Sequence, residues 1–202
     1  KKVLLLEKND RLGKKLLITG KGRCNVTNDC TAQDVLQNTP RNGRFLFSAM
    51  TAYPPEKIKA FFEDRGCALK TERGNRVFPV TDKAISVLDC LQNELRRQKV
   101  TVKPARVREI VTVEGRAVGV KTQNDVILAS WVILATGGFG RLFPESTNSA
   151  DIGGDGCAMA SLAGCGLTDM EFIQFEPSAA VWPPQLSGKS IITTMFYEGA
   201  VL

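Results

Sequence analysis

The sequence has no histidine, and its six cysteines are scattered without a Cys-x-x-Cys pair. Because most protein zinc sites use histidine or closely spaced cysteines, we expect no metal site, and acid–base catalysis by histidine is excluded for these residues. No apolar run approaches the roughly 20 residues that cross a bilayer, and the charged start does not lead into a signal-peptide core. The cysteines are expected to be reduced thiols. We therefore expect a cytoplasmic protein with no membrane partner.

Acidic residues are scarce only near the start of the chain. The 202 residues carry 27 basic and 21 acidic side chains, a net charge of +6, and residues 1–23 hold eight of the basic and two of the acidic ones. The remainder is therefore neutral. A basic cluster confined to one segment favours a small polyanion such as a pyrophosphate over a nucleic-acid duplex, which needs an extended basic surface. We expect no nucleic-acid partner. The 43% hydrophobic content is enough for one sizeable core and a small second lobe.

Three segments point to a nucleotide-binding α/β fold. Residues 1–8 (KKVLLLEK) read as a buried strand that ends in an acid, and residues 12–28 form a long glycine- and lysine-rich loop. Residues 131–134 read as a second buried, parallel strand that runs into two glycines. In such folds an acid after the second strand binds the adenosine ribose, and glycine loops hold the pyrophosphate. Glu7 is the candidate acid. The strand and glycine turn that precede it in these folds are absent from the sequence, so we expect a piece of a larger dinucleotide enzyme.

The rest of the chain alternates between helical and strand patterns. Thr81 is expected to cap the clearest helix, at about residues 82–98, and Gly66 to end another. Period-two alternation predicts a three-stranded meander at residues 107–113, 117–122 and 126–129. The other expected helices are residues 32–38, 45–52, 54–65 and 153–163, and the other expected strands are residues 68–72, 76–80, 171–175 and 191–196, with a loop at residues 177–188.

Glycine-rich segments are the candidate ligand contacts. In the first, Gly13 and Gly22 accompany Lys14, Lys15 and Arg23, so the segment offers open backbone amides together with cations for phosphate oxygens. The alternative is a flexible basic surface loop, but a solvated loop has no reason to contain the apolar residues found here.

Two later glycine motifs follow the same logic. Thr136, Gly137 and Gly138 follow the apolar residues 131–134 and either bring a ligand close or form a plain turn. Asp155 stands among glycines at an expected helix start, where it either caps the helix, which we favour, or accepts hydrogen bonds from a polyol.

These motifs carry a resemblance. GKGRCNVTN (residues 20–28), VFPVTDKA (77–84) and ATGG (135–138) resemble the FAD/NAD(P)-dependent oxidoreductase family of YhiN- and BaiN-like flavoproteins. Residues 147–178 are more similar to the flavoprotein subunits of fumarate reductase, succinate dehydrogenase and L-aspartate oxidase. The resemblance implies an α/β fold of the Rossmann type that binds FAD or NAD(P), as in glutathione reductase. The fold would be incomplete, and it would include a three-stranded β-meander and the start of a substrate domain. It implies an FAD-binding domain at residues 1–171, with an insertion at about 32–100, and a second domain that begins at residue 172.

The resemblance also assigns roles to residues. Glu7 would hold the adenosine ribose with Lys8 beside it, and Asp155 would bind the ribityl side. The backbone of Val107 would meet the adenine. The pyrophosphate, ribityl chain and flavin edge would lie against the other matching positions, which are Gly13, Lys14, Lys15, Gly22, Arg23, Cys24, Asn25, Thr136, Gly137 and Gly138.

The implied reaction is hydride transfer by FAD. It reduces an activated C=C bond or dehydrogenates a small organic substrate, with NAD(P)H as the electron donor. The alternatives are a noncatalytic nucleotide-binding module and a fumarate reductase-like enzyme for dicarboxylates. Against the latter, Glu176 stands where the fumarate reductases have histidine, and its charge would repel a dicarboxylate. Thr193 and Phe196 replace the glutamate and arginine of that family's proton relay, and we expect packing or loop roles for Glu176, Tyr197 and Glu198. The catalytic residues and the oligomeric state are not predicted.

Overall fold

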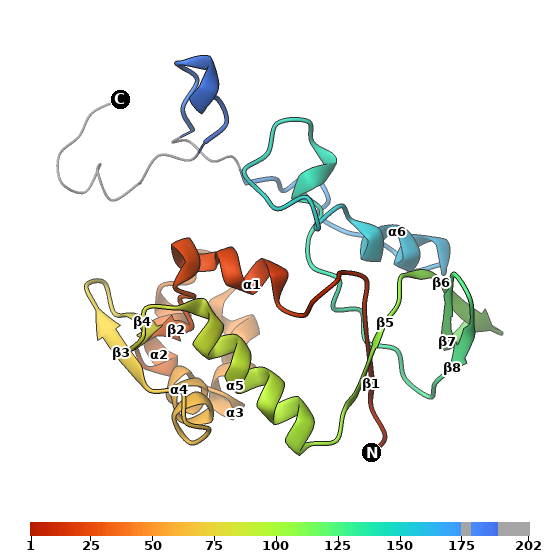
Figure 1. Ribbon diagram of the computed structural model, residues 1–202, viewed down its shortest axis with the longest axis horizontal. Helices are drawn as coiled ribbons and strands as arrows, with labels where there is room; N and C mark the ends of the chain where they lie inside the picture. Colours follow the sequence, from red (N-terminus) through yellow and green to blue (C-terminus); the bar gives the residue numbers. More distant parts are fainter. Residues whose placement is uncertain (175–178, 190–202) are drawn as a thin grey trace. The chain divides into compact units, whose positions relative to one another are not determined.

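The computed structural model describes residues 1–174 and 179–189 (Figure 1). The chain divides into two compact units, Lys1–Pro104 and Ala105–Leu202. The predicted strand at 191–196 lies outside the described residues, as do Glu176, Thr193, Phe196, Tyr197 and Glu198.

A parallel pair of strands opens and closes the first unit. Strand β1 (Leu4–Glu7) pairs in parallel with β5 (Thr101–Pro104), with Leu4 opposite Thr101 and Glu7 opposite Pro104. Figure 1 shows the two strands side by side, with the rest of the unit between them in sequence. Parallel strands require such a crossover connection. The first strand is confirmed at Leu4–Glu7, but none of its residues is buried, which corrects the expectation of a buried strand. Strand β5 was not predicted, since it is short and its four residues are all exposed.

Short helices and one small sheet fill the crossover. Helix α1 (Lys14–Ile18) and the 3-10 helix η1 (Thr19–Gly22) occupy the segment predicted as a loop, which corrects that prediction. The apolar side chains that a solvated loop could not explain pack inward, with Leu16, Leu17 and Val26 against the core. The elements that follow are α2 (Ala32–Gln37), η2 (Gly43–Leu46), α3 (Phe47–Ala52) and α4 (Pro55–Glu63).

An antiparallel sheet of three short strands precedes the longest helix. Strand β4 (Arg76–Pro79) lies between β2 (Thr27–Asn28) and β3 (Leu69–Glu72). Helix α5 (Ala84–Arg97) follows, and its N-cap is Lys83. The predicted cap at Thr81 is therefore wrong. Asp82 has a left-handed backbone with φ 56° and cannot start the helix, and the hydroxyl of Thr81 is hydrogen bonded to Ser86 Oγ at 2.7 Å instead.

The core of the first unit lies where α4 and α5 meet the glycine-rich segment. Phe62 of α4 and Val87 of α5 are buried there, and the aliphatic side chains of Ile58 and Leu91 pack around them. The buried cluster consists of Cys24, Phe62, Cys67, Ala84, Val87 and Cys90. Gly66, with φ 82°, follows α4 as predicted, since a left-handed residue ends a helix.

The second unit contains the predicted meander. Strands β6 (Val107–Val113), β7 (Arg116–Thr122) and β8 (Val126–Leu128) pair antiparallel in sequence order. Glu114 and Gly115 both have positive φ, which is the geometry of a tight hairpin turn. Helix α6 (Asp155–Leu162) and the 3-10 helices η3 (Gly140–Leu142) and η4 (Pro184–Leu186) complete the unit.

Two predicted strands of the second unit are wrong. Residues 131–134 form no strand, and Trp131 and Ile133 are each 88% exposed. Residues 171–174 also form no strand, and Phe172 is 75% exposed. An apolar run forms a strand only beside a partner, and neither segment pairs with a strand among the described residues. Across residues 1–174 and 179–189, no helix has the length and apolar content needed to traverse a bilayer, and no cluster of His, Cys, Asp and Glu has the makings of a metal site.

Candidate functional site

Glu7 ends the parallel strand β1, where nucleotide folds place their acid. Its Oε1 accepts a hydrogen bond from the backbone amide of Asn9 at 2.8 Å, so the carboxylate is held at the end of the strand. The residue is half-buried, and the neighbouring Lys8 is exposed. The geometry leaves carboxylate lone pairs for a ribose hydroxyl.

Gly13 begins helix α1, and packing explains its lack of a side chain. Its φ is 72°, and an added Cβ would collide with Leu88 Cδ1 and lie 3.0 Å from Leu88 Cδ2. Helix α1 therefore lies close against α5. Lys14 Nζ is 3.4 Å from Asp10 Oδ1, and this positive charge lowers the pKa of Asp10. Lys15 is exposed.

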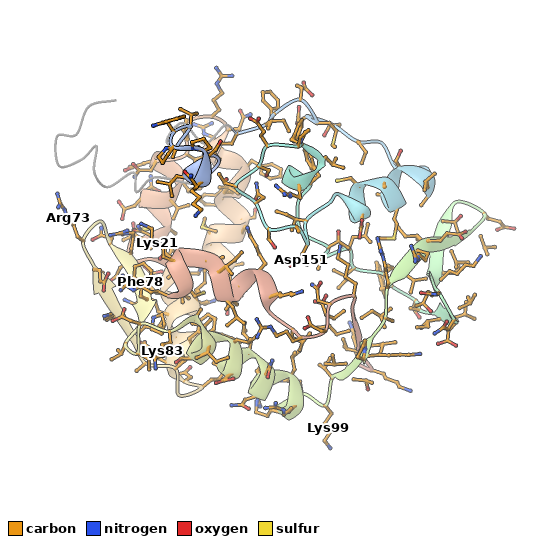
Figure 2. All side chains as sticks on the ribbon, turned by 45° about the horizontal axis from the view of Figure 1, so that its top comes forward. Lys21, Arg73, Phe78, Lys83, Lys99 and Asp151 are labelled. Atoms are coloured by element: carbon orange, nitrogen blue, oxygen red, sulfur yellow. The ribbon has the colours of Figure 1, made fainter. Side chains whose placement is uncertain are left out.

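Arg23 is held by two acids. Its guanidinium donates to Asp82 Oδ1 at 2.8 Å through Nε and to Glu72 Oε1 at 2.5 Å through Nη2. It also lies 4.1 Å above the ring centre of Phe78, the residue labelled in Figure 2. Lys70 donates to Asp82 Oδ2 at 2.6 Å. The hydrogen bond from Arg23 lowers the pKa of Glu72, and those from Lys70 and then Arg23 lower that of Asp82. The two cations and two anions balance each other.

The side chain of Cys24, next to Arg23, is buried, whereas Asn25 is exposed. Cys24 has φ 61° and is 7% exposed, and burial raises the pKa of its thiol. The side-chain amide of Asn25 donates to the carbonyl oxygens of Val77 at 3.1 Å and Thr27 at 2.9 Å. Gly22, with φ 84°, is exposed. The Cys24 thiol is therefore closed to a ligand, and the Arg23 guanidinium is already paired with two acids.

The second unit brings two glycine motifs together. The amide of Gly154 donates to the carbonyl oxygen of Gly138 at 3.3 Å, and an added Cβ at Gly156 would collide with Thr136 Oγ1. Gly137 has φ 79°, and its added Cβ would lie 3.1 Å from Ile152. The turn at residues 136–138 is thus in contact with the start of helix α6.

The start of α6 lacks a side-chain cap. Its N-cap is Gly154, with φ 81° and no capping hydrogen bond from a side chain, so the interpretation of Asp155 as the cap is wrong. Asp155 is the first helical residue, and its Oδ2 is 3.9 Å from Arg106 Nη2. Val107 follows Arg106 at the start of β6. The expected contacts Val107, Asp155 and residues 136–138 therefore come from elements that meet within this unit.

Sequence reasoning missed the partners that hold these segments. The acids of the Arg23 cluster, Glu72 and Asp82, were not predicted, although alternation in β3 places Glu72 on the same face as Lys70. Gly156 was read only as a residue at the helix start, whereas it provides the close contact with Thr136. No sequence signal identifies that contact, because its two residues lie on different elements.

A parallel strand that ends in an acid, in the first unit, and a glycine turn against a helix start, in the second, are each features of Rossmann-type nucleotide-binding proteins. The sequence model of the family described as the HI0933-like protein Rossmann domain matches residues 1–168, and the chain belongs to this family. The resemblance read from the motifs and the fold class are thereby confirmed.

The curated relatives carry the names of reductases and oxidases. A 3-dehydro-bile acid delta(4,6)-reductase of Clostridium scindens is 32% identical over 162 residues, which cover 80% of this chain and 37% of the relative. An L-aspartate oxidase of Bacillus subtilis is 33% identical over 53% of this chain and 22% of its own length. A fumarate reductase flavoprotein subunit of Mycobacterium tuberculosis is 54% identical over 27% of this chain and 9% of its own length. The chain thus spans less than two fifths of each of these relatives.

Proposed function

We propose that the protein binds FAD and is an oxidoreductase that transfers hydride between the flavin and a small organic substrate, with NAD(P)H as the electron donor. The substrate has an activated C=C bond to be reduced or a C–H bond to be dehydrogenated. The contact between the turn at residues 136–138 and the start of α6 carries this proposal. The family and the names of the relatives support it.

The geometry of that turn fits a cofactor. An added Cβ at Gly138 or at Gly153 would meet no atom within 4 Å, so the space in front of these backbones is open. Residues 136–138 are exposed, and the first amides of α6 have no side-chain cap. Helix starts favour negative charge and hydrogen-bond acceptors. A diphosphate at the glycines and a polyol at the Asp155 carboxylate match these donors and acceptors.

The first unit would supply the other contacts. We assign the adenosine ribose to Glu7, with Lys8 next to it, because the Asn9 amide already fixes the carboxylate. Exposed Lys15 is the cation we assign to phosphate. We assign only backbone contacts to residues 22–25, since Glu72 and Asp82 neutralise Arg23.

FAD, when bound, supplies hydride chemistry at its N5 atom, and the protein's part is to bind and orient the reactants. The chain's own residues fix the cofactor through amides and the carboxylates of Glu7 and Asp155. We propose that residues 1–171 form the FAD-binding domain and that a substrate domain begins at residue 172. We also propose that the protein works in the cytoplasm, because all six cysteines are free thiols, as in a reducing compartment.

An alanine substitution separates a ligand contact from a folding requirement. Gly138 lacks a left-handed φ and has open space where a Cβ would stand, so Gly138→Ala should leave the unfolding midpoint unchanged. If FAD passes against this backbone, the same methyl group should weaken FAD binding by about fivefold or more, as a misfit methyl costs about 1–3 kcal/mol. Flavin absorbance and fluorescence quenching during FAD titration measure this.

The matched control is Gly166→Ala. Gly166 is also exposed, without a left-handed φ and with nothing near an added Cβ, but it lies outside the proposed site. It should bind FAD like the unaltered protein. Equal FAD affinities for both variants would refute the assigned contact. A purified protein that is colourless and takes up no added FAD would refute the proposed cofactor, whereas bleaching by NADH or NADPH would identify the donor.

A further inference from the structure

A shallow hollow in the first unit is lined by none of the residues assigned to FAD. It has a volume of about 560 Å³ and is formed between α2 and α3 by Thr39, Arg41, Asn42, Arg44, Phe45 and Leu46. Neither the family match nor the proposed cofactor accounts for it. The question is what ligand its chemistry would accept.

The backbone under the hollow is a fixed turn. Asn42 adopts φ 56°, and its carbonyl oxygen accepts from the amide of Phe45 at 2.8 Å. Thr39 Oγ1 donates to the carbonyl oxygen of Val35 at 2.7 Å, which ties the turn to α2. An added Cβ at Gly43 would collide with the Leu36 carbonyl oxygen, so the turn lies directly against that helix. The side chains of the hollow are therefore presented from a defined surface.

Two arginines in the hollow have no acidic partner. Arg41 and Arg44 are exposed and form no ion pair with any residue at 1–174 or 179–189. Arg23 and Arg65 of the same unit, by contrast, form ion pairs with acids. The nearest acid before them, Asp34, is bonded to Thr31 in the capping box of α2. The charge of the hollow is therefore uncompensated.

Apolar surface lies beside these charges. Phe45 is 87% exposed and Leu46 lines the same hollow, while Phe47 next to them is 60% exposed. Exposed rings are common, but a ring beside two unpaired guanidinium groups offers both an apolar surface and anion recognition. Arginine pairs bidentately with carboxylate, and ligand sites combine apolar surface with a few such polar groups.

We propose that this hollow binds a small amphipathic organic anion, with its carboxylate or sulfonate on Arg41 and Arg44 and its apolar body against Phe45 and Leu46. The charge complementarity and the open ring select this class over a neutral apolar molecule or a small inorganic anion. This proposal does not depend on the proposed flavin site, so an experiment that refutes one of the two sites does not refute the other.

Binding of 2-naphthoate tests the proposal, with 2-naphthamide and acetate as probes that each lack one half of its chemistry. Titration by isothermal calorimetry or by naphthoate fluorescence should show saturable binding of 2-naphthoate at one site. Naphthamide and acetate should bind at least tenfold more weakly. Arg41→Gln combined with Arg44→Gln, and separately Phe45→Ala, should each weaken naphthoate binding at least tenfold.

Arg116→Gln is the control for a general loss of charge, because Arg116 is an exposed arginine at the start of β7 in the other unit. Its naphthoate affinity should stay unchanged. Equal weakening by Arg116→Gln, or tight binding that survives loss of both hollow arginines, would overturn the proposal. Adsorption to vesicles of anionic phospholipid without binding of monomeric naphthoate would also overturn it and assign the surface to a membrane.

Discussion

Replacing Gly13 with alanine tests whether this candidate phosphate-binding glycine is required by the fold. Gly13 has φ 72°, and its missing Cβ would lie among the terminal carbons of Leu88. An alanine there incurs two costs. The left-handed backbone costs a residue with a Cβ about 1–2 kcal/mol, and overpacking against the Leu88 side chain costs about 1–3 kcal/mol. We therefore expect Gly13→Ala to lower the free energy of unfolding by about 2–5 kcal/mol.

Gly74→Ala is a matched control within the same unit. Gly74 has φ 75° in the turn between β3 and β4, and an added Cβ there would meet nothing within 4 Å. It carries the backbone cost of about 1–2 kcal/mol without the steric one. Any gain from the smaller entropy of the unfolded alanine chain is common to both variants and cancels in the comparison. The difference between them isolates the contact of α1 with α5.

Urea unfolding followed by circular dichroism measures both variants. The dependence of the unfolding free energy on urea should be the same in each, so that the midpoints can be compared directly. Gly13→Ala should be less stable than Gly74→Ala by about 1–3 kcal/mol. Losses that agree within about 0.5 kcal/mol, the usual scatter for surface changes, would refute the close packing. A normal stability with weakened FAD binding would instead assign Gly13 to the cofactor.

Two more measurements probe the charges and the thiols. The native pKa values of Glu72 and Asp82 are below their ordinary values of 4.5 and 3.8 because they accept hydrogen bonds from cations. The native state thus binds fewer protons than the unfolded state, so this part of the stability is complete above about pH 5 and is lost as the pH falls through the native pKa values. Melting temperatures of Arg23→Gln should fall less steeply below pH 5 than those of the unaltered protein, and parallel curves would contradict this. In maleimide labelling followed by peptide mass spectrometry, exposed Cys165 should react in the native protein, whereas Cys67, 5% exposed and with a pKa raised by burial, should react only after unfolding. Native labelling of Cys67 at the rate of Cys165 would show that its burial is wrong.

Local patterns predicted the elements that their own residues stabilise. Helix α5 has an apolar face that repeats at helical spacing, and the strands β6, β7 and β8 alternate and are joined by tight turns, so both were found in the sequence. The family could be predicted from short motifs for the same reason, because turns that require glycine are visible in the sequence as glycine motifs. The class of protein could thus be predicted before the structure.

The elements that depend on distant partners were not predictable in this way. Strand β5 is exposed at all four residues and is defined by its pairing with β1, which no local pattern reveals. Residues 131–134 show the reverse case. Their apolar run predicted a buried strand, but among the described residues no strand pairs with it. The role of Arg23 at a phosphate stays a prediction, whereas its two acidic partners could not be predicted, because they follow 49 and 59 residues later.

The environment of each glycine separates what the fold requires from what a ligand would require. At Gly13 and Gly156 an added Cβ would collide with Leu88 or Thr136, so packing alone accounts for both glycines. At Gly138 and Gly153 the backbone is not left-handed and the added Cβ would meet open space, so neither conformation nor packing explains why a side chain is missing. These two glycines flank the uncapped start of α6. Gly166 has the same open geometry without a proposed ligand, so this feature alone assigns none. An alanine at Gly138 that disturbs binding without disturbing folding is the evidence that would assign a ligand to this backbone.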